Sequence, residues 1–441
     1  MTLRKLALSL TLLGSVSLTQ AADLLEVYRA ARNYDAGYAA ASAARDAERE
    51  KAPQARAGLL PSIGLVASTT RNRVESTPRA GGLASDAEYN SNGWTISLTQ
   101  PLFRWQNWQG YQQGELLVAN AEARFAQAGQ ELLLRVTQAY FDVLLAQETV
   151  ASVQALKLAT VEQLASARRN FEVGTASITD THEAQARHDL IVAQEIAAAN
   201  DLAVRQQFLL TLTGEAYSQL DGLKQDVNIG RPVPDDMAQW ASLAEHGNIG
   251  VQVAETAREV ARREVEKQSA GHYPTVDLVA SHGRSATGFS STAPGGLDSR
   301  TTTIGLQLNL PIFAGGSVSS KSREVAALHE KSRAELENAR RQAVLAARQA
   351  YLAFSNGQAQ IKAFEAGVTS SQLALDANKL GYEVGIRINM DILNAQSQLF
   401  DTRVKLVKAR LDTMLSLLRL KQAAGILAEE DLAAINTLLK R

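Results

Sequence analysis

The chain contains one pattern twice, and this duplication constrains its fold more than any other feature. Phe-Glu-Val-Gly at 171–174 recurs as Tyr-Glu-Val-Gly at 382–385, an offset of 211 positions. Gln-Pro-Leu-Phe at 100–103 matches Leu-Pro-Ile-Phe at 310–313 at an offset of 210. Further matches in the same order join 60–63 to 273–276, 139–140 to 350–351 and 213–214 to 424–425. The period is far too long for a solenoid unit and indicates a duplicated domain.

The N-terminus has the features of a secretory signal. Arg4 and Lys5 precede a short apolar run, and Ala21 ends a stretch of small residues suited to cleavage. The alternative is an N-terminal membrane anchor, but the run is short for a hydrocarbon layer ~30 Å thick. The organisation that we predict is a signal peptide at 1–21, a first repeat at 22–226, a connector at 227–237, a second repeat at 238–430 and a tail at 431–441.

Each repeat carries two segments in which apolar and polar residues alternate. These are 62–70 and 93–100 in the first repeat, and 275–282 and 303–310 in the second. Period two predicts strands with one apolar face, of nearly the ~9–11 residues that a tilted transmembrane strand needs. The alternative is a half-buried sheet in a soluble domain. The Gly-, Ser- and Asn-rich stretches between them, 71–92 and 283–300, are expected to be surface loops.

Four strands are too few to close a barrel, because about eight are needed to fill even a small one. If the strands cross a membrane, open sheet edges are forbidden, so several subunits must pool their strands. The largely polar second face then suggests a water-filled bore.

Long stretches without proline follow each strand pair, at 105–170, 317–381 and 389–424. The first alone would form a helix of ~100 Å. Apolar residues recur every seven positions, which predicts coiled-coil packing. The rows are Val136, Val143 and Val150; Ile392, Leu399 and Leu406; and Leu393, Phe400, Val407 and Met414. We expect a hollow helical barrel; the alternative is a solid bundle or a rod-like coiled coil.

A Val-Gly turn interrupts the helix-prone stretch of each repeat. Gly174 and Gly385 free the backbone for a left-handed residue at a helix end. New helices are expected to begin near 179–180 and 389–391, where an aspartate favours the positive end of the helix dipole. These turns are simple helix hairpins, or they close the far end of a tube.

Several classes of function have no support in the sequence. The chain has no Cys and a formal net charge of -1, which disfavours thiol chemistry and a nucleic-acid partner. No phosphate-binding, hydrolase or zinc-protease motif is present, and His182 and His188 lie six apart, which does not suit a metal site on a helix. The acidic pair at 235–236 lies in the connector and is expected to be solvated. We therefore predict neither an enzyme nor a cofactor or metal site.

Taken together, these segments resemble the TolC family of outer-membrane efflux proteins over the whole mature chain. The most specific stretches are 60–65, 139–144, 171–180 and 381–394. The resemblance implies a homotrimer with a twelve-stranded transmembrane β-barrel in the outer membrane, continued by a coiled-coil α-barrel across the periplasm. It implies a periplasmic adaptor and an inner-membrane pump of the ABC or RND type as partners. Substrates would be drugs, other small molecules or type I secreted proteins.

The resemblance also implies a closed gate at the hairpin tips. Tyr382 and Arg387 match the donors of the gate, and Thr179 and Asp180 match their acceptors. Tyr382 would bond Asp180 within a subunit, and Arg387 would reach Thr179 and Asp180 of the next one.

Other positions match the adaptor-docking tips and the constriction. Val173, Gly174, Val384 and Gly385 correspond to the tips. At the constriction, close relatives can carry two aspartates three residues apart, whereas this chain has Asp391 followed by Asn394. One acidic ring is therefore expected to be lost and cation selectivity to be weaker. The alternative to an export channel is a non-pore structural or adhesive coiled-coil protein of the periplasm.

Overall fold

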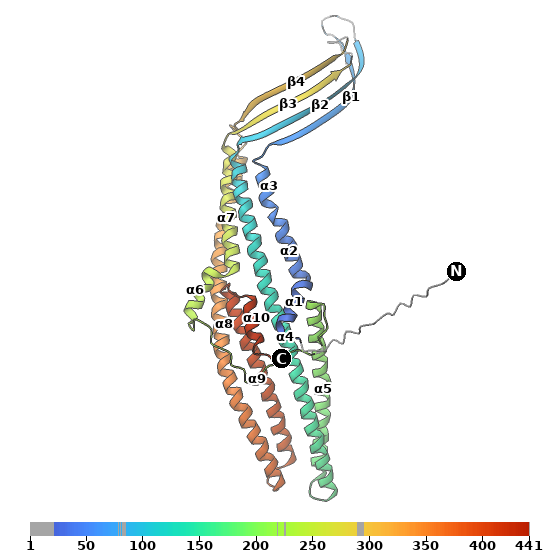
Figure 1. The fold of residues 1–441 in the computed structure, drawn as a ribbon, viewed down its shortest axis with the longest axis vertical. Helices are drawn as coiled ribbons and strands as arrows, with labels where there is room; N and C mark the ends of the chain where they lie inside the picture. Colours follow the sequence, from blue (N-terminus) through green and yellow to red (C-terminus); the bar gives the residue numbers. More distant parts are fainter. Residues whose placement is uncertain are drawn as a thin grey trace, which may run out of the picture. The chain divides into compact units, whose positions relative to one another are not determined.

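The computed structural model describes residues 22–77, 79, 81, 85–217, 219–224, 226–288 and 295–440, so the expected signal peptide lies outside the described residues. Figure 1 shows the elements. In chain order they are α1 (Leu24–Tyr34), α2 (Ala36–Arg49), α3 (Lys51–Ala57), β1 (Ser62–Ser76), β2 (Ser85–Phe103), α4 (Trp105–Glu172), α5 (Ile178–Thr213), α6 (Met237–Gly247), α7 (Ile249–Ser269), the short 3-10 helix η1 (Ala270–His272), β3 (Thr275–Thr287), β4 (Leu297–Asn309), α8 (Ser317–Glu383), α9 (Asn389–Ala423) and α10 (Glu429–Asn436).

Two compact units make up the chain, and each draws on both repeats. The unit that we call the helical unit comprises the described residues of 22–39, 129–241 and 346–440. The sheet unit comprises Ala40–Ala128 and Ser242–Leu345. A strand pair and then a long helix occur once in each half of the chain, as the duplication predicts.

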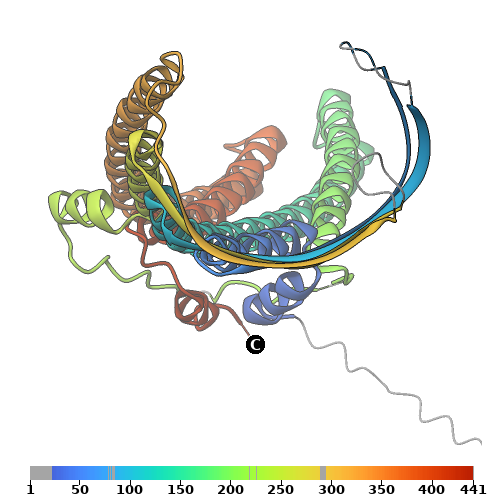
Figure 2. The same cartoon turned by 90° about the horizontal axis from the view of Figure 1, so that it is seen from above.

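The sheet unit contains one antiparallel sheet with the strand order β1-β2-β3-β4. Its strands follow a common arc, so the sheet is curved (Figure 2). The two hairpins have the same register: Ser62 pairs with Thr99 in the first, and Thr275 pairs with Asn309 in the second. β2 joins the hairpins by pairing with β3, which leaves β1 and β4 at the two edges of the sheet.

The strands are longer than the alternation predicts, so the expected loops are partly wrong. β1 continues to Ser76 and β2 begins at Ser85, which places most of 71–92 in strands. β3 and β4 likewise include 283–287 and 297–300.

Ion pairs between neighbouring strands lie along this extension. Arg71 lies 2.7 Å from Glu88, and Arg284 pairs with Asp298. Such pairs stabilise a ladder without any apolar alternation, which was the only signal available from the sequence.

One face of the sheet is apolar and is not covered by the rest of the described chain. Ile63, Leu65, Ile304, Leu306 and Leu308 are between 66% and 77% exposed. The opposite face carries mainly small polar side chains, among them Ser281 and Thr303, whose hydroxyls are 2.7 Å apart. Large apolar side chains exposed together on one face of a sheet are typical of a surface that contacts lipid or another protein.

An ion pair fixes the junction between the sheet and the first long helix. Arg104 donates two hydrogen bonds to Asp277 on β3, at 2.8 and 2.6 Å, and the Asp277 side chain is only 9% exposed. The ladder between β2 and β3 shifts its register just before this point, between Pro101 and Phe103.

Apolar side chains of α1, α4, α5, α8, α9 and α10 form the core of the helical unit. Val136 and Val143 on α4 are fully buried. On α9, Ile392, Leu399 and Met414 are at most 2% exposed. These are members of the predicted seven-residue rows, and the three long helices lie within one or two residues of their predicted bounds. No helix in the described ranges is long and apolar enough to cross a membrane.

Tyr140, at the centre of this core, binds two segments that are distant in sequence. Its buried hydroxyl donates to the backbone oxygens of Ala22, at 3.1 Å, and Asp221, at 3.0 Å. The equivalent residue of the second repeat, Tyr351, donates instead to the side chain of Asp235 in the connector, at 3.0 Å. Both repeat-related tyrosines therefore hold non-helical chain against a long helix.

Candidate functional site

The first hairpin tip lies between α4 and α5. Gly174 has a φ of 78°, and the amide of Thr175 donates to the carbonyl of Asn170 at 2.8 Å, which ends α4. Ser177 then caps α5, and Asp180 completes a capping box by accepting from the amide of Ser177 at 3.1 Å. The left-handed glycine and the capped helix start explain why this short sequence folds into a tight turn.

The second tip, between α8 and α9, has the same turn with a different cap. Gly385 has a φ of 77°, and the amide of Ile386 donates to the carbonyl of Gly381 at 2.8 Å. The N-cap residue of α9 is Ile388, which supplies no side-chain hydrogen bond.

Both tips expose apolar side chains, and the space around their glycines is open. Val173 is 72% exposed and Val384 is 61% exposed. A Cβ added at Gly174 or Gly385 would meet no described atom within 4 Å, so these glycines are required by their backbone conformation and not by close packing.

Within a single chain, the hydrogen-bond partner of Tyr382 is not the predicted Asp180. The Tyr382 hydroxyl accepts from the side-chain amide of Asn170, at 2.9 Å. Asp180 is engaged by the helix start, where it caps the amide of Ser177. Tyr382 therefore contacts α4 through Asn170, a residue that no sequence motif identified.

The other expected gate residues are exposed or half-buried at the tips. Thr179 is exposed, and its hydroxyl is 2.6 Å from that of Ser177. Arg387 lies 3.6 Å from Asp391, and its side chain is 58% exposed. A Cβ at Gly381 would come within 2.7 Å of the Arg387 side chain, so Gly381 makes room for it.

Asp391 and Asn394 lie one turn apart near the start of α9. Asp391 is half-buried beside Arg387, and Asn394 is exposed. The charge at this level of α9 is therefore one carboxylate, partly offset by one guanidinium.

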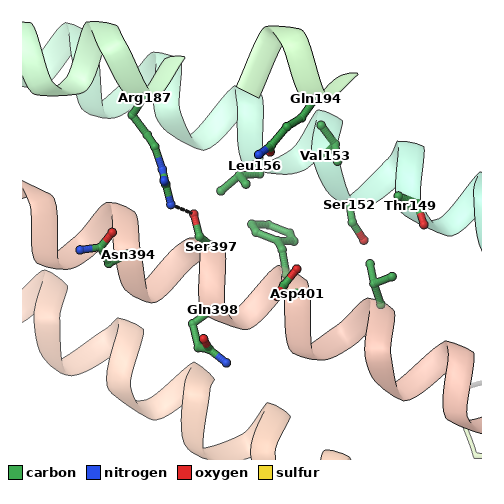
Figure 3. Close-up of a pocket in the computed structure, with 12 residues that line it drawn as sticks. Thr149, Ser152, Val153, Leu156, Arg187, Gln194, Asn394, Ser397, Gln398 and Asp401 are labelled. Carbon is green, nitrogen blue, oxygen red and sulfur yellow. Dashed lines mark hydrogen bonds between the residues drawn. The ribbon is translucent and has the colours of Figure 1, made fainter. Parts of the chain in front are cut away.

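A groove of about 490 Å³ begins beside Asn394 and runs between the α4/α5 hairpin and α9. Figure 3 shows Arg187 reaching from α5 across this groove to the hydroxyl of Ser397 on α9. The remaining lining is mixed: Thr149, Ser152, Gln194, Gln398 and Asp401 are polar, and Val153, Leu156, Phe400 and Val404 are apolar. The bond from Arg187 to Ser397 joins the two hairpins, and no motif in the sequence identified it.

Two buried side-chain amides near the second tip were also not identified from the sequence. In the described part of the chain, neither amide atom of Asn389 has a hydrogen-bond partner, and the side-chain oxygen of Gln396 has none. No group of three or more acidic, histidine or cysteine side chains among the described residues could hold a metal ion.

Comparison with known proteins decides the family. The sequence profile of the outer membrane efflux protein family matches residues 27–215 and 240–426, which is most of both repeats. The chain belongs to the outer membrane efflux protein family.

Individual relatives match this efflux protein over nearly its whole length. The outer membrane protein TolC of Vibrio cholerae is 32% identical over 422 residues, which is 95% of this chain and 94% of the relative. The proteases secretion protein PrtF of Dickeya chrysanthemi is 33% identical over 441 residues, which is 98% of this chain and 94% of the relative. The solved structure of the outer membrane protein VceC from Vibrio cholerae has a TM-score of 0.79 at 20% identity and covers 91% of this chain and 96% of its own.

These matches confirm the predicted family, the fold class with its two repeats, the outer-membrane location and the role of an exit duct for efflux or secretion. The relatives are channels and efflux proteins and not enzymes.

Proposed function

We propose that three copies of this efflux protein form one duct through the outer membrane. The observation that carries the proposal is the sheet, with four strands, two open edges and one exposed apolar face. Lipid cannot satisfy the backbone groups of an open edge, and four strands cannot close alone. Three sets of four strands would close the edges and turn the apolar face toward lipid.

The duct is proposed to serve an inner-membrane pump of the ABC or RND type through a periplasmic adaptor. The exposed valines and open glycines of both tips support docking by an adaptor hairpin. Since one relative is a proteases secretion protein, unfolded secreted proteins belong with drugs and other small molecules among the proposed substrates.

The gate is proposed to close between copies. Arg387 is exposed at the second tip. In the proposed gate it would reach Thr179 and Asp180 of the next copy. Asp180 uses one carboxylate oxygen for its own helix cap, and an ionised carboxylate has further acceptor sites. Charge-assisted hydrogen bonds contribute ~1.5–3 kcal/mol each, so three copies would hold the gate shut and still yield to an adaptor.

Fractionation of cells that produce the protein tests this function against the alternative of a non-pore coiled coil. A duct is expected in the outer-membrane fraction as a trimer that resists heating in detergent, and deletion is expected to abolish export. A soluble periplasmic species would favour the alternative.

Crosslinking in cells tests the partner. A photoreactive residue placed at Val173 or Val384 is expected to capture an adaptor protein, because both side chains are exposed at the tips. The same residue at Leu352, which is exposed at 51% on α8 away from the tip, provides the matched control. Capture from both sites alike would contradict docking at the tips.

A further inference from the structure

A groove of about 480 Å³ lies between α7 and α8 in the sheet unit. Its lining includes three arginines, Arg258 on α7 and Arg333 and Arg340 on α8, together with Glu330 and Glu337 on α8. The volume falls within the ~300–1,000 Å³ of typical small-molecule sites. The charge that the lining presents therefore decides which kind of ligand the groove suits.

Both glutamates of the lining are already neutralised within α8. Glu330 accepts two hydrogen bonds from Arg333, at 3.0 and 2.9 Å. Glu337 accepts from Arg341, which is not part of the lining, at 2.8 Å. One arginine of the lining and both of its carboxylates are thus accounted for, and two arginines remain.

Arg258 and Arg340 supply the remaining positive charge. In the described part of the chain neither side chain forms an ion pair, and the buried Nε of Arg340 has no hydrogen-bond partner. Glu259, which follows Arg258 in α7, is bound instead by Arg262, at 2.5 Å, and by Arg263, at 3.3 Å. Two guanidinium groups therefore line one groove without an ion-pair partner.

In the first repeat, the arginine that corresponds to Arg258 has partners for its charge. Ala-Arg-Asp-Ala-Glu-Arg at 44–49 matches Ala-Arg-Glu-Val-Ala-Arg at 257–262 at an offset of 213, so this arginine is Arg45 on α2. Its guanidinium carbon lies 4.2 Å from the centre of the Phe125 ring, and it forms an ion pair at 2.8 Å with the aspartate that follows it. Both contacts stabilise the charge of Arg45 inside its own repeat.

The long helices α4 and α8 correspond at an offset of 211, and three of the residues concerned differ between them. In the first repeat, Glu122 binds Arg49 of α2 at 2.6 Å, which joins the two helices. The replacements in α8 are Glu122 by Arg333, Phe125 by Leu336 and Gly129 by Arg340. An acidic and an aromatic partner are therefore lost in the second repeat, and two guanidinium groups are gained. The equivalent place is self-neutralised in one repeat and basic in the other.

We infer that the groove binds a small organic anion whose carboxylate or phosphate group is held by Arg258 and Arg340. Each guanidinium can donate two parallel hydrogen bonds to such a group. The groove is much larger than an inorganic ion, and the buried Leu336 gives its lining an apolar part, so an organic ligand fits better than a bare ion. The site lies within one chain and does not depend on the proposed trimer.

Isothermal titration calorimetry of the purified full chain tests the site, with citrate as a carboxylate probe and glycerol 3-phosphate as a phosphate probe. Saturable binding of at least one probe is expected. Arg258→Gln with Arg340→Gln is expected to weaken that binding about tenfold or more, because a hydrogen bond to a charged group contributes roughly a factor of ten in affinity. Glu330→Gln is expected to strengthen it several-fold, because the substitution removes a carboxylate from the groove and frees Arg333.

Arg323→Gln is the matched control. Arg323 is an exposed arginine of α8 that lies about 25 Å along the helix from Arg340 and outside the lining. The same loss of charge there is expected to leave the affinity unchanged.

Three results would overturn the site. The first is no saturable binding of either probe to the unaltered protein, as when a neighbouring copy fills the groove. The second is equal weakening by Arg323→Gln and by the double variant of Arg258 and Arg340. The third is an affinity that Glu330→Gln leaves unchanged or lowers, and this result alone decides if the double variant does not fold.

Discussion

Tyr382 and Arg387 lie at the second tip with different tasks. Tyr382 is tied to Asn170 of its own chain, at 2.9 Å, whereas Arg387 lies exposed beside Asp391. In the proposed gate, Tyr382 therefore aligns one chain's two hairpins, and Arg387 locks neighbouring chains together.

The first prediction concerns this lock. Tyr382→Phe with Arg387→Ser is expected to make the closed duct leaky, because both kinds of tie are removed at each of three tips. Single-channel conductance is expected to rise several-fold above that of the unaltered protein. Arg341→Ser, which removes an exposed arginine paired only with Glu337 on the same helix, is the control. Equal conductance in the gate variant and the unaltered protein would contradict the assignment of these residues.

The second prediction concerns the constriction. Asn394→Asp adds a carboxylate one turn from Asp391, so three copies would gain a second acidic ring. Cation selectivity is expected to increase, and block by multivalent cations is expected to strengthen, because clustered carboxylates attract cations. Reversal potentials across a salt gradient measure the selectivity. A reversal potential that does not move would show that position 394 is away from the conduction path.

The third prediction concerns the tip glycines. Gly174→Ala with Gly385→Ala forces a Cβ onto left-handed backbone at both tips, which costs about 1–2 kcal/mol per residue. Adaptor capture at the tips is expected to fall. Gly110→Ala is the matched control, because Gly110 lies within α4 where an added Cβ meets no described atom within 4 Å and alanine favours the helix. An equal effect of both changes would contradict a special role for the tips.

At this scale the sequence predicted what is local. The left-handed glycines and the aspartates at the helix starts follow from a few adjacent residues. The partner of Tyr382 could not be predicted, because Asn170 is 212 positions away in the sequence and the contact depends on how the two hairpins pack. The same holds for the bond between Arg187 and Ser397, which depends on how two hairpins pack.

Among the elements, the repeat-related tyrosines of α4 and α8 differ in burial. Burial raises the pKa of Tyr140 far above its ordinary value, so its hydroxyl remains a neutral donor at any working pH. Tyr351 binds the exposed carboxylate of Asp235, whose pKa is lowered mainly by the hydrogen bond from Arg231. The hydrogen bond that joins the connector to α8 is therefore exposed to solvent, whereas the hydrogen bond that joins the chain near Ala22 to α4 is buried.

The fourth prediction uses this difference. Tyr140→Phe is expected to destabilise the folded chain by about 1–3 kcal/mol, because the buried carbonyls of Ala22 and Asp221 each lose the hydrogen bond from its hydroxyl. Tyr351→Phe is expected to change stability by less than about 0.5 kcal/mol, as do most changes of exposed contacts. Urea unfolding of the purified protein compares the two. A Tyr351→Phe variant as unstable as Tyr140→Phe would contradict the burial argument.

Element boundaries also show where sequence patterns stop being informative. Helix bounds were close to the predicted ones because proline, glycine and caps mark them directly. The strands were predicted too short because their outer ends carry charged residues, such as Arg73 with Asp86 at 3.0 Å, instead of alternating apolar ones. Pairing between strands holds those ends, and it is invisible in a single segment.

For the whole molecule, duplication explains both compact units. Each repeat supplies a strand pair to the sheet unit and a long hairpin to the helical unit, so neither repeat is a separate folded domain. An internal repeat with open edges can be continued by further copies, and this makes a closed ring of identical chains the simplest way to complete the sheet.

The most direct test of this account is the current through purified trimers in planar lipid bilayers. The fifth prediction is that trimers of the unaltered protein insert and give discrete single-channel steps of low conductance, as a continuous water-filled duct with a closed gate requires. Trimers that insert without conducting, both unaltered and with Tyr382→Phe and Arg387→Ser, would contradict the claim that this chain forms an exit duct.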